Sequence, residues 1–361
     1  MTRTRLTSIV RQGTENAGLA LVLVFLAASV VLLIVIAGAS PINALQGVFA
    51  GAFGDRYALA ETLVQAVPIA LVALGVAPAL RAGIFTVGSE GQLAIGAATS
   101  TAAVLAVAGA PASVALPVGC IAGIFGGVLW AFLPALLRAR LHVNEILSTL
   151  LMNYLAGNLV LWLLRTALGT AEQVATPRSD RLPIEALIPK LVDGTRLHWG
   201  VLAVFLAALA LAYWIRSVRG LGYDVFATHR DLASRMGVRE PAAVMSTMLV
   251  SGAAAGFAGW LQVAGLQGTL YPSVAGGLGF TGVLVALLGG LSPLGILAAS
   301  LVMATLTTGS NGLQTDTGVP ASIAVVAQAL LLLGAALVFA ARQRRAQSAV
   351  PQKVEPVGDT P

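Results

Sequence analysis

The sequence predicts an all-α fold, a polytopic bundle of about ten transmembrane helices with both chain ends in the cytoplasm. The first observation is composition: 57% of the 361 residues are apolar and only 10% are charged, whereas a soluble domain carries about 25% charged residues. The second is a series of apolar runs, most of which reach the roughly 20 residues needed to cross a bilayer. The third is the clustering of basic residues in the links between these runs.

The apolar runs define the elements in order. The predicted spans are 17–39, 58–80, 83–108, 112–137, 144–167, 198–215, 241–265, 279–291, 293–309 and 318–341. The first is longer than the roughly 7–15 apolar residues of a signal-peptide core, so we expect a retained helix. The eighth and ninth are short, and only Ser292 and Pro293 separate them. They are either two tilted spans or a broken, re-entrant pair.

The distribution of Lys and Arg orients the spans. With the N-terminus inside, most of the 21 basic residues fall on the cytoplasmic side, as the positive-inside rule requires. The net charge of +6 is therefore explained by the orientation of the spans and does not indicate nucleic-acid binding. Segments 1–16 and 342–361 are then cytoplasmic, the second as a disordered tail, and 17–341 forms one transmembrane domain. Cys120 is the single cysteine, so neither a disulfide framework nor a cysteine metal site is expected.

Two links are long. The outer segment 168–197 is polar and contains three prolines, so we expect a loop exposed to the outside. The inner segment 216–240 predicts a short helix from Asp224 to Met236, with Gly237 as its stop signal. This inner helix is either an amphipathic link on the lipid surface or a docking element for a cytoplasmic partner.

The two halves of the chain each contain a glycine-rich apolar stretch, GIFTVGSEGQLAIGA at 83–97 and GGLGFTGVLVALLGG at 276–290. Glycine-interrupted segments in corresponding positions are typical of transporters built from internal repeats, where they mark the substrate path. The sequence therefore predicts an internal pseudo-repeat.

Several kinds of chemistry are excluded. A phosphate-binding P-loop needs a lysine after a glycine, but the two lysines, Lys190 and Lys353, lack that context. The three histidines do not have metalloprotease spacing, and no serine stands in a G-x-S-x-G motif. We therefore expect a transport protein with no cofactor of its own, and any ATP hydrolysis must occur in another subunit.

Polar side chains inside predicted spans are candidates for a translocation path, because charge near the bilayer centre is costly. The candidates are Glu61, Gln65, Glu90, Gln92, Asn153 and Asn158. Glu90 lies between Gly88 and Gly91, so it either contacts substrate or accepts hydrogen bonds from the exposed amides of a broken helix. Glu61 either lines the path or extends its carboxylate to the outer interface, and the two asparagines either join helices or line a path.

Three segments resemble the permease subunits of ATP-binding-cassette (ABC) importers. They are RAGIFTVGSEGQLAIGA (81–97), VNEILSTLLMNYLA (143–156) and GFTGVLVALLGGLSPLGILAA (279–299). The resemblance runs in order from about residue 58 to 341 and is closest to the branch of the branched-chain amino acid and ribose permease superfamily that handles nucleosides and simple sugars. It implies a ten-helix permease in a bacterial cell membrane.

The resemblance also implies partners: two cytoplasmic ATPases that bind ATP, a second permease (identical or homologous) and an extracytoplasmic substrate-binding protein. It favours the docking interpretation of the inner link, since ATHRDLASRMGV (227–238) is similar to the coupling helix of the family. The residues expected to couple the permease to the ATPase are Asp224, Ala227, Asp231, Ala233, Arg235, Met236 and Gly237.

The function that this resemblance implies is ATP-driven import of a nucleoside or simple sugar by alternating access. A branched-chain amino acid permease is an alternative within the same superfamily. Outside it, the alternatives are an ion-coupled secondary transporter, for which Glu90 would be the lone deep carboxylate, a membrane-embedded enzyme, and a structural or signalling subunit.

Overall fold

The computed structural model describes residues 40–170 and 176–317, together with residues 24, 28, 29, 31–36 and 38 and scattered positions between 322 and 337. Within this part of the chain the protein is built from helices, and its only β-bridges are the isolated pairs Gly169–Ser179 and Lys190–His198. The predicted all-α fold is confirmed. The predicted spans 17–39 and 318–341 lie largely outside the described residues.

The helices follow the apolar runs of the sequence. They are α2 (Pro41–Phe53), α3 (Arg56–Arg81), α4 (Ser89–Ala106), α5 (Ala112–Leu141), α6 (Glu145–Arg165), α7 (Gly200–Arg216), α8 (Val218–Thr228), α9 (Arg230–Arg235), α10 (Glu240–Leu261), α11 (Leu278–Leu288) and α12 (Pro293–Thr317), with a 3₁₀ turn at Ile184–Ala186 and a π-helical turn at Gln262–Gln267. Five helices of the described chain are long and apolar enough to cross a membrane, or six if the bent pair α7 and α8 is one span.

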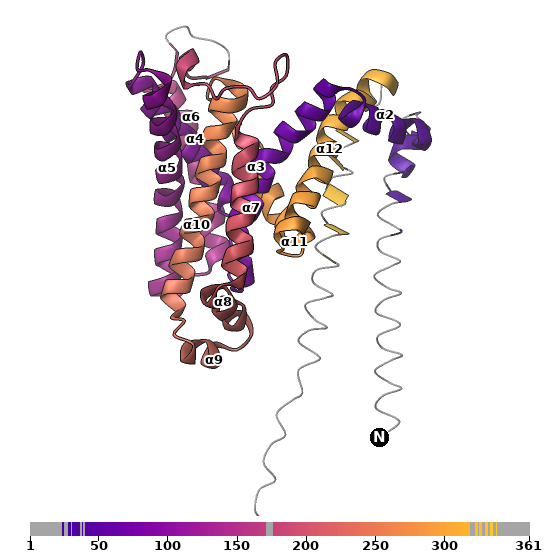
Figure 1. Ribbon diagram of the computed structural model, residues 1–361. Helices are drawn as coiled ribbons and strands as arrows, with labels where there is room; N and C mark the ends of the chain where they lie inside the picture. Colours follow the sequence, from indigo (N-terminus) through magenta and orange to yellow (C-terminus); the bar gives the residue numbers. More distant parts are fainter. Residues whose placement is uncertain are drawn as a thin grey trace, which may run out of the picture.

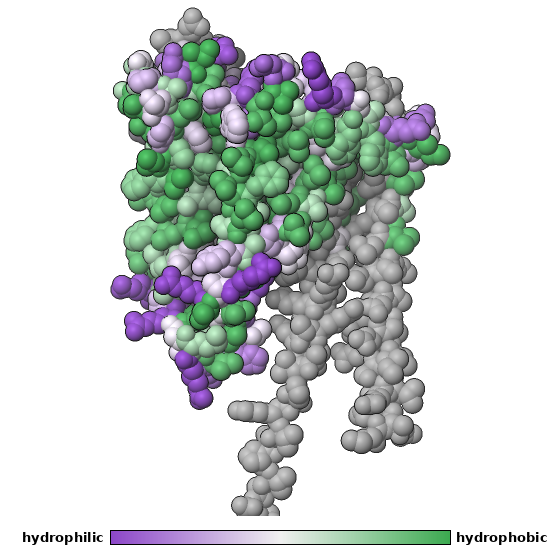
Figure 2. All heavy atoms as spheres, viewed as in Figure 1, coloured by the Kyte–Doolittle hydropathy of each residue, from purple (hydrophilic) through white to green (hydrophobic). Residues whose placement is uncertain are grey.

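The bundle has two polar ends and an apolar band between them (Figure 2). In Figure 1 the short helices α8 and α9 lie at the end opposite the loop between α6 and α7. We call the α8–α9 end inner and the loop end outer, following the orientation predicted from the basic residues. Apolar side chains such as Leu151 and Leu209, more than 60% exposed, cover the band. The protein is a multi-pass membrane protein.

Glycines bring the central helices together. Gly96 of α4, Gly127 of α5 and Gly256 of α10 meet so closely that a Cβ atom on any of them would collide with a neighbouring backbone. Close backbone approach through small residues is how helices pack in lipid, where the hydrophobic effect between helices is absent. α3 runs beside this group, and its segment from Val67 to Ala79 is buried.

Helix α2 was not predicted. Its 13 residues are too few to cross a bilayer, so a span-length criterion missed it. The helix packs on α12, where Gly51 faces Gly312 and Gly309 faces Val48. Figure 1 shows α2 and α12 side by side, away from the group formed by α4, α5 and α10.

The pair 279–309 has a short first helix. α11 has 11 residues, which give it a length of only about 16 Å. A non-helical segment, 268–277, leads into it, and a turn at 289–292 leads on to the 25-residue α12. The interpretation as two full tilted spans is therefore wrong for the first member of the pair.

Two other helix boundaries differ from prediction. The span 83–108 becomes helical only at Ser89, because residues 84–87 have no regular secondary structure. The inner link is not one helix from Asp224 to Met236 but two, which meet at His229. The Thr228 hydroxyl donates to the Val225 carbonyl and lies 3.0 Å from His229 Nδ1, and such local side-chain bonds compete with helix continuation. The stop at Gly237 is confirmed by its φ of 83°.

Candidate functional site

The N-termini of α4 and α11 meet inside the bundle. A Cβ atom on Gly279 would collide with the backbone of Ser89 and Glu90, so the two chains are in direct contact. α4 runs outward from this point beside α10, where Gly96 meets Gly256. α11 runs inward beside α3, because Gly282 contacts Val72 and Arg81 bonds to the Leu291 carbonyl. We call this head-to-head contact the α4–α11 junction.

The glycine-rich stretches 83–97 and 276–290, predicted to correspond, are the segments that meet at the junction. Each contains non-helical residues followed by a helix N-terminus. In many transporters the substrate site is formed where non-helical backbone leads into helix N-termini inside the bundle.

Glu90 joins the two helix ends. Its Oε1 accepts a hydrogen bond from the Gly277 amide at 2.7 Å, and its Oε2 accepts one from the Gly279 amide at 2.8 Å. These amides belong to the first turn of α11, where backbone donors have no helical partner. A carboxylate is favoured there by the positive end of the helix dipole. Glu90 thus has the geometry expected of a structural carboxylate, while contact with substrate stays a prediction.

Asn153 of α6 holds the other side of the junction. Its Oδ1 accepts from the Gly91 amide at 2.9 Å, and its Nδ2 donates to the Val87 carbonyl at 2.8 Å. Irregular backbone at membrane depth is tolerated only where protein groups satisfy it. Asn153 therefore supplies hydrogen bonds to one amide in the first turn of α4 and to one carbonyl in the non-helical segment before it.

Neutral polar side chains lie beside the junction. Gln92, 1% exposed, has its Oε1 3.4 Å from the Ser251 hydroxyl of α10, and the Ser89 hydroxyl is also 3.4 Å from Ser251. Sequence reasoning missed Ser89 and Ser251. A serine in an apolar helix usually bonds to its own backbone, so its sequence position gives no signal of a shared cluster.

The other predicted path residues lie elsewhere. Asn158 is on an exposed face of α6 and donates back to the Tyr154 carbonyl of its own helix at 2.8 Å. Glu61 and Gln65 are in the outer half of α3, where Gln65 donates to Glu61 at 3.1 Å. Glu61 also pairs with Arg196 of the outer loop, with Arg196 Nε 2.9 Å from its Oε2. The structure thus brings Glu90, Gln92 and Asn153 together and leaves the other three outside the junction.

The outer loop folds over the end of the bundle. The Leu182 amide donates to Gly268 at 2.9 Å and the Ile188 amide to Ala264 at 3.0 Å. The hydrogen bonds that Arg196 donates to the Glu61 carboxylate raise the pKa of Arg196. His198, just before α7, is 2% exposed, and burial lowers its pKa to about 4. Part of the predicted exposed loop is therefore an anchored cap on the helices.

The inner link, residues 216–240, forms the opposite surface, which we call the coupling loop. Ala233 is fully buried and Phe226 is 6% exposed, so both face the bundle. Asp224 is paired with Arg81 of α3. The remaining predicted coupling residues are exposed: Ala227, Asp231, Arg235, Met236 and Gly237. An open hollow of about 440 Å³ is lined by Thr228, His229, Arg230, Asp231, Leu232 and Arg235.

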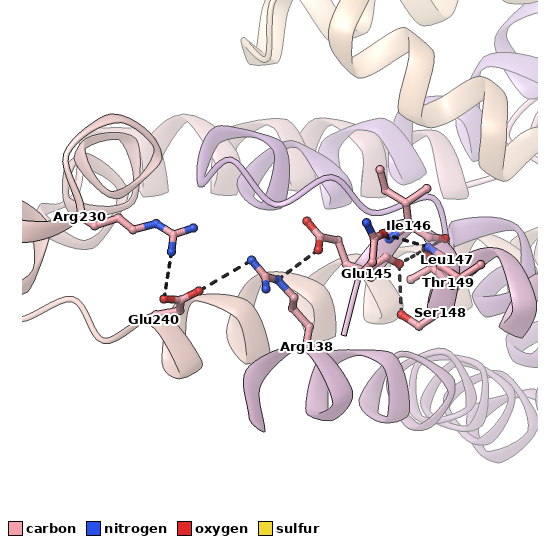
Figure 3. Close-up of polar contacts among 9 residues, drawn as sticks. Arg138, Glu145, Ile146, Leu147, Ser148, Thr149, Arg230 and Glu240 are labelled. Atoms are coloured by element: carbon pink, nitrogen blue, oxygen red, sulfur yellow. Dashed lines mark hydrogen bonds and ion pairs between the residues drawn. The ribbon is translucent and has the colours of Figure 1, made fainter. Parts of the chain in front are cut away.

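A chain of ion pairs fixes the coupling loop to three helix ends (Figure 3). Arg230 of α9 lies 3.3 Å from Glu240 at the start of α10, and Glu240 lies 3.8 Å from Arg138 of α5. Arg138 also lies 3.1 Å from Glu145 in the first turn of α6. The preceding residue, Asn144, caps α6 by accepting hydrogen bonds from the Ile146 and Leu147 amides.

Comparison with known families identifies the protein class. Residues 58–341 match the model of the branched-chain amino acid transport system permease component. The chain belongs to this family. It is therefore a transport component and not an enzyme. Within the described residues, no group of three or more His, Cys, Asp or Glu is placed to hold a metal ion.

Three curated relatives of this permease cover most of both chains. It is 32% identical to the guanosine ABC transporter permease protein NupP of Bacillus subtilis, over 86% of this chain and 90% of the relative. It is 35% identical to the glucose ABC transporter permease protein TsgB13 of Haloferax volcanii, over 81% of this chain and 80% of the relative. It is 29% identical to the nucleoside ABC transporter permease protein NupB of Lactococcus lactis, over 89% of this chain and 90% of the relative. No solved structure matches the chain.

Proposed function

We propose that this permease forms the translocation path of an ABC importer for a nucleoside or a simple sugar. The names of its relatives, which include guanosine, nucleoside and glucose permeases, support this substrate class. The single structural observation that carries the proposal is the α4–α11 junction, where two helix N-termini, each preceded by non-helical residues, meet beside neutral polar side chains.

The chemistry of the junction favours an uncharged, hydroxylated substrate. Gln92, Ser89 and Ser251 offer amide and hydroxyl groups that can both donate and accept hydrogen bonds. Both carboxylate oxygens of Glu90 are already engaged by backbone amides. A free amino acid would bring an ammonium and a carboxylate, and each would need an available partner of opposite charge on burial. The junction suits ribose or hexose hydroxyls better.

The energy source in this proposal is a pair of ATPase subunits bound to the coupling loop. The chain has no P-loop sequence, and the exposed residues of α9 surround a hollow at the inner end. An extracytoplasmic binding protein would deliver substrate at the outer loop, and a second permease, identical or homologous, would complete the path. The chain itself carries no cofactor in this scheme.

Uptake by the assembled transporter tests the proposal. The permease is expressed with a cassette ATPase, a second permease and a binding protein from the same organism. Membrane vesicles are then given radiolabelled guanosine, glucose or leucine. We expect guanosine or glucose to accumulate only with ATP, and accumulation to persist when an ionophore collapses the proton and sodium gradients. Leucine uptake would favour the amino acid alternative, and loss of uptake with the ionophore would favour ion coupling.

A further inference from the structure

Arg81, the last residue of α3, bonds two other elements at the inner end. Its Nε donates to Asp224 Oδ1 at 2.8 Å, and Nη2 pairs with the second oxygen of Asp224 in the coupling loop. Its Nη1 lies 3.4 Å from the Leu291 carbonyl, in the turn after α11. A guanidinium presents its donors in one rigid plane, so it can hold two partners at once. In the described chain, Arg81 is the one side chain bonded to both the coupling loop and this turn.

Leu291 is fixed to the inner end of α11. Its amide donates to the Ala286 carbonyl at 3.0 Å, and the Gly290 amide donates to Leu287 at 3.0 Å, which closes the last turn of the helix. A cation beside these terminal carbonyls is also favoured by the helix dipole. α11 therefore has Arg81 at its inner end and Glu90 at its outer end.

The coupling loop is packed firmly on the same end of α3. Phe226 and Ala233 are buried in one apolar cluster with Ala79 and Ala82. The turn between α3 and α4 joins this contact, because a Cβ on Gly83 would lie 3.4 Å from Ala227. A displacement of the coupling loop would thus move the inner end of α3, where Arg81 lies.

We propose that Arg81 is a positioning residue for transport, which carries movement of the coupling loop through α11 to the α4–α11 junction. The link runs from Asp224 to Arg81, then through the Leu291 carbonyl and the length of α11 to Glu90. This inference rests on the proposed function, since it assumes that an ATPase moves the coupling loop. It adds the route by which that movement reaches the centre of the membrane.

The test measures guanosine imported per ATP hydrolysed, in vesicles that hold the full transporter. Arg81→Gln removes both contacts, and Arg81→Lys keeps a charge for Asp224 but lacks the fork needed to hold Leu291 as well. We expect both variants to retain ATP hydrolysis and to import about tenfold less substrate per ATP, within the usual range of coupling between sites. Arg140→Gln is the matched control, because this exposed arginine lies in the last turn of α5 at the inner end, outside the coupling loop. Its ratio of substrate imported to ATP hydrolysed should be unchanged.

Co-purification of the ATPase with each variant separates coupling from assembly. A lowered ratio in an assembled Arg81 variant supports the proposal. An unchanged ratio in an assembled variant overturns it, and so does a failure of both variants to bind the ATPase, since Arg81 would then serve assembly alone. A wild-type transporter that shows no ATP-driven uptake of guanosine or glucose would instead contradict the proposed function.

Discussion

The Glu90 carboxylate accepts a hydrogen bond from the backbone amide of Gly277 at 2.7 Å, across 187 positions of sequence. A second bond to the Gly279 amide fixes the carboxylate against the first turn of α11. The two helix N-termini would otherwise direct unpaired donors and like partial charges at each other. Glu90 therefore makes the head-to-head contact of α4 and α11 possible.

Replacing Glu90 by Gln should destabilise the permease. A glutamine has one acceptor oxygen in place of two. Its side-chain NH₂ group would face a backbone N–H of α11, and because both groups are donors, that backbone amide loses its hydrogen bond. The expected loss is about 1–3 kcal/mol in the free energy of unfolding, measured by denaturant or thermal unfolding in detergent. Glu185→Gln, in the exposed part of the outer loop, is the control. Equal stability of the two variants would show that the Glu90 bonds contribute little.

Gly279→Ala tests how closely the helices meet. The added methyl would collide with the backbone of Glu90, so α4 and α11 must separate, and strain of this kind costs about 1–3 kcal/mol. Gly157→Ala in α6 is the opposite case, since a Cβ there meets nothing within 4 Å. In a helix, replacing glycine by alanine increases the free energy of unfolding by up to about 1 kcal/mol. Unfolding of the two variants should therefore shift in opposite directions, and parallel shifts would contradict the close contact.

Local patterns predicted the helices, and non-local pairing defined the site. Hydropathy placed α3, α5 and α6 correctly because crossing a bilayer requires a long apolar run wherever it occurs. The same criterion could not find α2, whose 13 residues do not span. It also gave no sign that Glu90 would cap α11, because that bond depends on how distant segments pack. The sequence did single out Glu90, since an isolated carboxylate between glycines needs a partner.

Asn153→Ala and Asn158→Ala form a matched pair on one helix. The two residues are five positions apart, so they lie on different faces of α6, but the sequence does not say which face is inward. Asn153 bonds the Gly91 amide and the Val87 carbonyl, and its removal should cost about 1–3 kcal/mol. Asn158 is exposed, so its removal should change stability by less than about 0.5 kcal/mol. Equal effects in thermal unfolding would contradict this assignment of faces.

His198 should make the outer cap sensitive to acid. Burial lowers its pKa to about 4, whereas an unfolded histidine has a pKa of about 6.5. Between these two pH values His198 is protonated in the unfolded chain but stays neutral in the folded loop. The folded state therefore loses stability as the pH falls from 6.5 to 4. Above pH 6.5 both states are neutral, and the penalty vanishes; below pH 4 it reaches its full size of about 3 kcal/mol.

The measurement compares wild type with His198→Asn, whose side-chain oxygen can still accept from the Gly200 amide that His198 Nδ1 binds at 3.0 Å. Thermal unfolding in detergent is followed from pH 7.5 to pH 4.5. Carboxylates titrate in both proteins and cancel in the difference, so the difference reports His198 alone. Wild type should lose stability relative to the variant as the pH falls, because the variant has no imidazole to protonate. If the two unfolding profiles stay parallel over this range, the buried neutral state of His198 is wrong.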